Sequence, residues 1–203
     1  METKIHFSQP EIELLSNAEI ILTKNNVLQK VKNLLQYLQQ QMINHVNNDN
    51  DFSAQHTLFA TPPKISKGEN YLGLPYLVLD YPRNFTPENI FAVRSLFWWG
   101  NFFSITLHLS GRYKTQFAHK MVNAFEQLAH KDYYININED QWHHHFEASH
   151  VILIKQMASS EFKRLCNEND HLKISTKWPI IELDSVTGNI LNSWKLFLSI
   201  LLS

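Results

Sequence analysis

Alternation of apolar and polar positions identifies the middle of the chain as a β-hairpin. Residues 102–109 place two sets of side chains in turn: Phe103, Ile105, Leu107 and Leu109 in one set, Phe102, Ser104, Thr106 and His108 in the other. A period of two is typical of a half-buried strand. The dipeptide Gly100-Asn101, between this run and the apolar run before it, favours a tight turn. We predict a central hairpin at about residues 90–110 with one face in the core.

Helical periodicity appears in four other segments. Apolar residues recur at helical spacing and predict packed helices at about 27–46, 112–131, 159–168 and 186–202. The first is the end of an N-terminal helical segment, residues 8–46, which begins with a Ser8/Glu11 capping-box pattern and which we expect Asn25-Asn26 to interrupt. The apolar stripe of residues 27–46 favours packing on a core, and a dimer seam is the alternative. The polar residues 47–57 predict a flexible loop.

The remaining β-rich segments define the fold class. They predict strands within residues 74–81, 133–138 and 172–183, and one or two more within residues 142–157. Pro179 interrupts the strand at 172–183, which predicts a position at the sheet edge or a bulge. Helices and strands are grouped along the chain instead of alternating regularly, which favours an α+β fold with a mainly antiparallel sheet. The 203 residues fit a single domain.

The composition of the chain argues against nucleic-acid binding, membrane association and an intrachain disulfide. The chain has 18 basic and 19 acidic residues, so it lacks the excess of positive charge that nucleic-acid binding requires. No apolar run reaches the ~18 residues of a membrane helix, which argues against membrane association. A single cysteine, Cys166, excludes an intrachain disulfide, and the first residues show no signal-peptide pattern. We therefore expect a cytoplasmic protein.

Histidines provide the first candidate site. The chain contains 11 of them, and three follow one another in Trp142-His143-His144-His145-Phe146-Glu147, with His150 just beyond. If this segment is a strand, His143, His145 and Glu147 share one face. Two imidazoles at this spacing can bind one transition metal such as zinc, and His108 from the hairpin could supply a third nitrogen. Three ligands and an open position would activate water.

Arginines and aromatic residues provide the second candidate site. Arg94 lies in an otherwise apolar stretch and must be paired if it is buried. A structural pair with Asp80 or Glu88 is favoured over an open site that binds the carboxylate or phosphate of a small anionic ligand. The residues expected to line such a ligand site are Arg94, Arg112, His108, Trp98 and Tyr81.

No catalytic motif accompanies these candidates. The sequence has no Gly-x-Ser-x-Gly, Walker A or Gly-x-Gly-x-x-Gly pattern. The sequence therefore favours a non-catalytic ligand-binding or protein-interaction domain without a cofactor, which forms a homodimer through sheet aromatics or the apolar C-terminal helix. The alternative is a metal-dependent enzyme or metal binder that uses His143, His145, Glu147 and His108.

Overall fold

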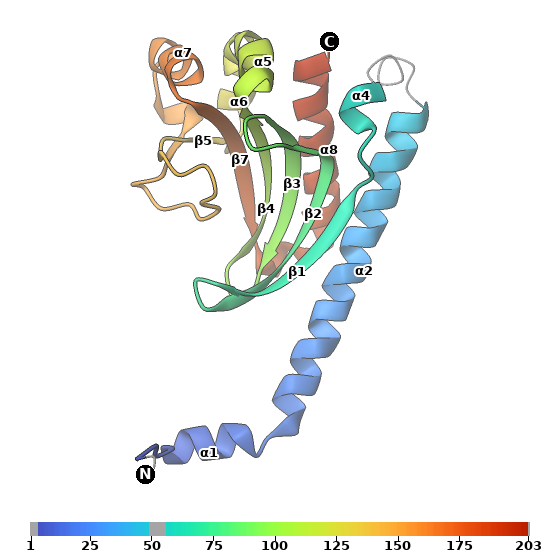
Figure 1. Ribbon diagram of the computed structural model, residues 1–203, viewed down its shortest axis with the longest axis vertical. Coiled ribbons are helices and arrows are strands. Elements are labelled where there is room, and N and C mark those ends of the chain that lie inside the picture. Colours follow the sequence, from blue (N-terminus) through green and yellow to red (C-terminus); the bar gives the residue numbers. More distant parts are fainter. Residues whose placement is uncertain (1–3, 49–55, 203) are drawn as a thin grey trace.

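The predicted hairpin lies at the centre of an antiparallel sheet. The structure is a computed structural model that describes residues 4–48 and 56–202, and within them seven strands pair in the order β1-β2-β3-β4-β7-β5-β6 (Figure 1). The strands are β1 Lys64–Tyr71, β2 Leu74–Phe85, β3 Ile90–Trp98, β4 Phe102–Ser110, β5 Tyr134–Asn136, β6 Val151–Leu153 and β7 His171–Pro179. The α+β fold class is confirmed.

The register of the hairpin follows the alternation of its side chains. Strands β3 and β4 pair from Ile90–Ser110 to Trp98–Phe102. Between them, Gly100 has a φ of +72°, a conformation that glycine adopts without steric cost. Phe103 and its three apolar companions in β4 belong to the main core, as the pattern predicts.

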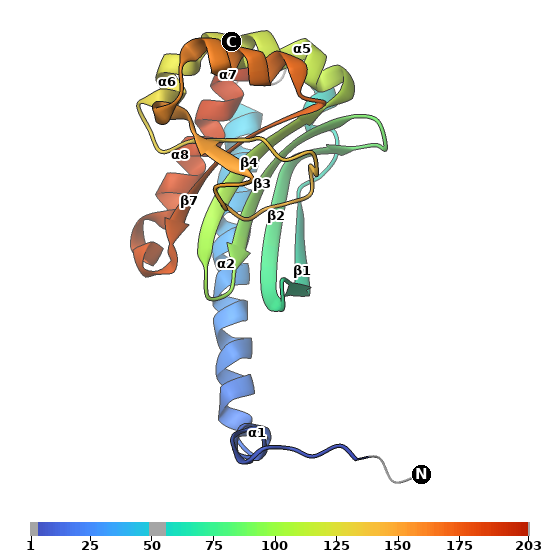
Figure 2. The same ribbon diagram turned by 90° about the vertical axis from the view of Figure 1, so that its left-hand side faces the viewer.

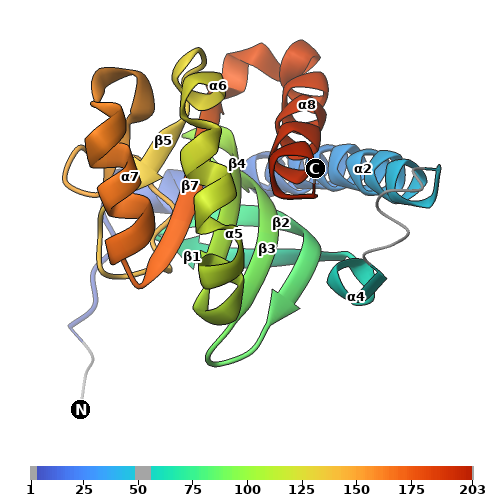
Figure 3. The ribbon, with the colours of Figure 1, turned by 90° about the horizontal axis from the view of Figure 1, so that it is seen from above.

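Helices cover one face of the sheet and one of its ends. The α-helices are α1 Gln9–Leu15, α2 Ala18–Asn48, α4 His56–Phe59, α5 Gly111–Asn123, α6 Phe125–Ala129, α7 Ser159–Glu168 and α8 Leu183–Leu202, with 3₁₀ turns η1 Ile154–Gln156 and η2 Ile180–Glu182. Helices α2 and α8 lie in contact on the same face, whereas α5 and α7 cross one end of the sheet (Figure 3). Among the described residues, no helix combines the length and apolar character that crossing a membrane requires.

The main core lies between this face of the sheet and the helices. The stripe of α2 that begins at Leu28 and ends at Val46 is buried there, so its packing on a core is confirmed. Trp194 of α8 is fully buried, and its indole N–H donates to the carbonyl oxygen of Tyr81 at 2.6 Å. The apolar side of α8 and most of the sheet aromatics are therefore buried within the chain, and Trp99, at the hairpin turn, is partly buried. This corrects the expectation that they are surfaces for a partner.

The second face of the sheet is covered by a loop instead of a helix. Residues 137–150 run across it, with α2 on the far side of the sheet (Figure 2). One end of this face is apolar, where Phe102 packs with Trp98 and, from the loop, Phe146. The rest of the face, which we call the polar floor, carries Asp80, Arg94, Thr106, His108, Lys173 and Ser175.

Two helix boundaries differ from the predicted ones. Helix α2 continues through Asn25-Asn26, and the interruption falls instead at Ser16-Asn17. There the Asn17 side chain accepts a hydrogen bond from the Glu19 N–H at 3.0 Å and begins the new helix. The predicted helix 112–131 is divided at Ala124 into α5 and α6. Of the predicted loop 47–57, residues 47–48 belong to α2 and 56–57 to α4, and 49–55 lie outside the described residues.

Two strand predictions are also corrected. The histidine segment does not form a strand, because among residues 142–157 only β6 is extended and paired. Strand β7 ends at Pro179 but is not an edge strand, since it pairs with β4 on one side and β5 on the other. Proline is tolerated there because it is the last residue of the strand.

Candidate metal centre

The loop over the polar floor is held by two cationic side chains of the sheet. The ammonium group of Lys173, on β7, donates to the carbonyl oxygens of Gln141 (2.9 Å) and His143. The guanidinium of Arg94, on β3, lies 2.9 Å from Nε2 of His144. Both side chains come from strands of the sheet, so their contacts attach the loop to the polar floor.

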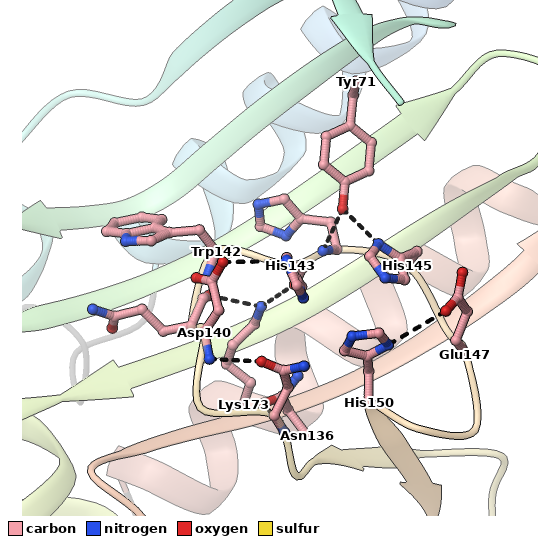
Figure 4. A network of polar contacts seen from close by, with 12 residues as sticks. Tyr71, Asn136, Asp140, Trp142, His143, His145, Glu147, His150 and Lys173 are labelled. Carbon is pink, nitrogen blue, oxygen red and sulfur yellow. Dashed lines mark hydrogen bonds and ion pairs between the residues drawn. The ribbon is translucent and has the colours of Figure 1, made fainter. Parts of the chain in front are cut away.

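Three histidines of this loop converge. His143, His145 and His150 each offer one ring nitrogen, and these three atoms lie within 4.8 Å of one another (Figure 4). The ring centroids are 4.9 Å apart for His143–His145 and 4.6 Å apart for His145–His150. Zinc binds imidazole nitrogen at about 2.0–2.1 Å, so two nitrogens on one ion lie at most about 4.2 Å apart, and rings at the 4.8 Å limit would have to close around the ion.

A polar group contacts one nitrogen of each ring. His143 Nε2 lies 3.2 Å from the Asp140 carboxylate. His150 Nδ1 lies 3.1 Å from the Ser149 hydroxyl and 3.6 Å from the Glu147 carboxylate. His145 Nδ1 lies 3.0 Å from the Tyr71 hydroxyl. Because a carboxylate only accepts hydrogen bonds, Asp140 favours the tautomer of His143 that leaves Nδ1 unprotonated.

The second ring nitrogen of His143 gives separate support for a metal site. Nδ1 of His143 is buried and has no hydrogen-bond partner within residues 4–48 and 56–202. An unsatisfied buried polar atom is costly, on the order of 1–3 kcal/mol. A bound metal ion would satisfy this nitrogen.

Burial and nearby positive charge lower the pKa values of His145 and Lys173. Burial lowers the pKa of His145, and the adjacent His150 lowers it further. Burial and the charge of Arg94 lower the pKa of Lys173 to about 7. A low imidazole pKa favours the neutral ring, which is the form that binds metal.

The predicted ligands are only partly brought together. His143 and His145 converge, but from a loop and not from the face of a strand, and His150 completes the group. Glu147 is not in this group and pairs with His150 instead. His108 is buried and hydrogen-bonded to the Gln141 side chain at 3.0 Å.

The predicted anion site is not assembled. Arg94 is engaged by Asp80 in two hydrogen bonds, of 2.8 and 2.9 Å, as the favoured structural pair predicts. Arg112 contacts Tyr113 at the start of α5. Tyr81 belongs to the main core on the opposite face of the sheet and stacks on Trp194.

Trp98 also has a structural role in place of the predicted ligand contact. It packs with Phe102 in the apolar part of the loop-covered face, and its indole N–H donates to the carbonyl oxygen of Tyr71 at 3.1 Å.

The fold and the histidine group together define an α+β domain with a candidate site for a transition metal on a surface loop. Comparison of the chain with models of known protein families, with curated proteins and with solved structures finds no match.

Proposed function

We propose that this protein binds one transition-metal ion, with zinc as the best fit, through His143, His145 and His150. The convergence of three ring nitrogens within 4.8 Å carries the proposal. Three neutral imidazoles suit zinc and copper better than magnesium or calcium, which prefer oxygen ligands. The contacts of Asp140, Glu147 and Tyr71 support it, because polar partners of this kind orient metal-binding imidazoles.

The space between the loop and the sheet is small. The cavity next to His143 and His145, which Lys173 and Ser175 also line, holds about 10 Å³. That is about the space of one water molecule, which could serve as a fourth ligand. The proposed role is therefore that of a metal-binding domain.

Metal analysis of untagged protein tests the proposal. After incubation with zinc and removal of free ion, the wild-type chain should retain one zinc per chain. His143→Ala, His145→Ala and His150→Ala should each lower zinc affinity at least about 10–100-fold, because loss of a partner that only orients a ligand already costs that much. Competition with a chromophoric chelator measures the affinity.

The matched control is His119→Ala, because His119 is exposed on α5 and lies outside the histidine group. It should bind zinc like the wild type. Loss of binding in this control, or less than a tenth of an equivalent of zinc on the wild type, would contradict the proposal.

A further inference from the structure

The N-terminal arm, defined as residues 4–23, buries none of its residues against the rest of the chain that the structure describes, 24–48 and 56–202. Every one of its residues is exposed, and α1 lies apart from the sheet and its covering helices (Figure 1). Helix α2 first reaches the core at Leu28. A seven-residue helix is too short to persist alone in water, where isolated helices below about 12–15 residues are marginal. The arm therefore requires packing that one copy of the chain does not provide.

The arm is also strongly apolar. Its large apolar residues are between 44% and 70% exposed: Ile5, Phe7, Ile12, Leu14, Leu15, Ile20, Ile21 and Leu22. Together they offer on the order of 900 Å² of surface, if a large apolar residue offers about 200 Å² when fully exposed. That sum is comparable to the ~800 Å² of surface that each partner buries in a stable complex.

A receiving surface lies where the arm leaves the domain. A groove of about 570 Å³ is lined by residues from α2 and the two adjoining strand turns, among them Ile20, Thr23, Leu74, Pro75 and Trp99. It is mostly apolar, and four of its lining residues, Asn17, Glu19, Ile20 and Thr23, belong to the arm. Two copies related by a two-fold axis can therefore place each arm against the groove of the other in one continuous interface.

Charge argues against a membrane as the occupant. The arm carries Glu11, Glu13 and Glu19, with no Lys or Arg between Lys4 and Lys24. An acidic segment is repelled by the anionic surface of a membrane. The groove itself is lined by one acidic and one basic side chain, Glu19 and Lys24, so it suits the apolar residues of an arm. Because arm and groove belong to the same chain, a second copy supplies both halves of the contact.

We propose that this chain forms a two-fold homodimer in which the N-terminal arm of each copy packs into the groove of the other. The proposal is independent of the metal site, because it rests on different residues and a different measurement.

Light scattering of the full-length chain at tens of micromolar tests the dimer. The wild type should have twice the mass of one chain, and the double variant Leu15→Asp plus Ile21→Asp should be monomeric. Both side chains are exposed, so circular dichroism of the variant should match the wild type. Ile181→Asp is the control, since Ile181 is 91% exposed on η2, and it should remain dimeric. A monomeric wild type, or a dimeric arm variant, would overturn the proposal.

Cross-linking tests where the arm lies. Mixing a chain that carries Ile12→Cys with one that carries Thr23→Cys should give a disulfide-linked dimer of the two variants under mild oxidation. The native Cys166 is buried and does not compete. Absence of this mixed product in a dimeric sample would exclude the arm-in-groove arrangement.

Discussion

Asp80 and Arg94 face each other directly across β2 and β3, and the guanidinium donates one hydrogen bond to each carboxylate oxygen, at 2.8 and 2.9 Å. The same guanidinium contacts His144 in the loop above. One cross-strand pair thus links the sheet to the segment that carries the candidate metal ligands.

Removing Arg94 should be strongly destabilising. Arg94→Met leaves the buried Asp80 carboxylate without its partner, and loss of one member of such a pair typically costs about 3–5 kcal/mol. Because the guanidinium is partly exposed, we expect a value near about 3 kcal/mol in urea unfolding. The double variant Asp80→Leu plus Arg94→Met should lose less than the sum of the single variants. Arg164→Met, which breaks an exposed ion pair with Glu168, should change stability very little, and an equal loss there would contradict this account.

The hydroxyl of Tyr71 should matter to both the loop and the metal. It accepts a hydrogen bond from the backbone N–H of His144 at 2.7 Å and contacts Nδ1 of His145. Tyr71→Phe should lower zinc affinity about 10–100-fold, because the ring of His145 loses its orienting partner. Chelator competition measures the affinity. Tyr76→Phe is the control, since Tyr76 packs against the Tyr71 ring and should bind zinc normally. Equal affinities for the two variants would show that the hydroxyl does not orient the ring.

Two buried histidines of the loop-covered face should make the fold sensitive to acid. Burial and then the charge of Lys173 lower the pKa of His108 to about 3 and that of His171 to about 4. In the unfolded chain both titrate near about 6.5, so below that pH the unfolded state binds more protons and stability falls. The stabilisation is complete above about pH 6.5, and each group should lose up to about 1.4 kcal/mol per pH unit below it.

Urea unfolding across this acidic range measures the effect. His108→Gln should remove about half of the dependence that these two groups produce. His119→Gln, at an exposed position, should leave the dependence unchanged. A slope that His108→Gln does not alter would show that His108 is not kept neutral by the fold.

Cys166 should be inert in the native protein. Burial raises the pKa of its thiol to about 12, although the nearby Lys114 acts in the opposite direction. The reactive thiolate is therefore scarce, and reagents cannot reach the side chain. A disulfide reagent at about pH 8 should label the cysteine only at the rate of unfolding. Labelling of the folded chain within seconds would contradict its burial.

The central hairpin could be predicted because its pattern is local. Alternation from Phe103 to Leu109 determines which side chains enter the core, and Gly100 allows the turn, so register and hairpin follow from neighbouring residues. The interruption of the N-terminal helices at Ser16-Asn17 was harder to predict. Asparagine costs only a few tenths of a kcal/mol inside a helix, and it breaks one only where its side chain finds a cap.

The candidate site was only half predictable for a similar reason. The conformation of residues 137–150 depends on Lys173, Arg94 and Tyr71, which are distant in sequence. Alternation therefore selected Glu147, which pairs with His150 instead, and did not place His150 in the histidine group. The spacing of His143 and His145 indicated a shared site, although a strand is not what brings them together.

All three candidate ligands lie between His143 and His150, within eight consecutive residues. A chelate this local survives, in part, when the chain unfolds, because closing a short loop costs little entropy. Metal bound by the unfolded chain subtracts from the stabilisation that native binding provides. Zinc should therefore raise the melting temperature by less than its affinity for the native protein implies, and this domain should be able to capture its ion before it folds.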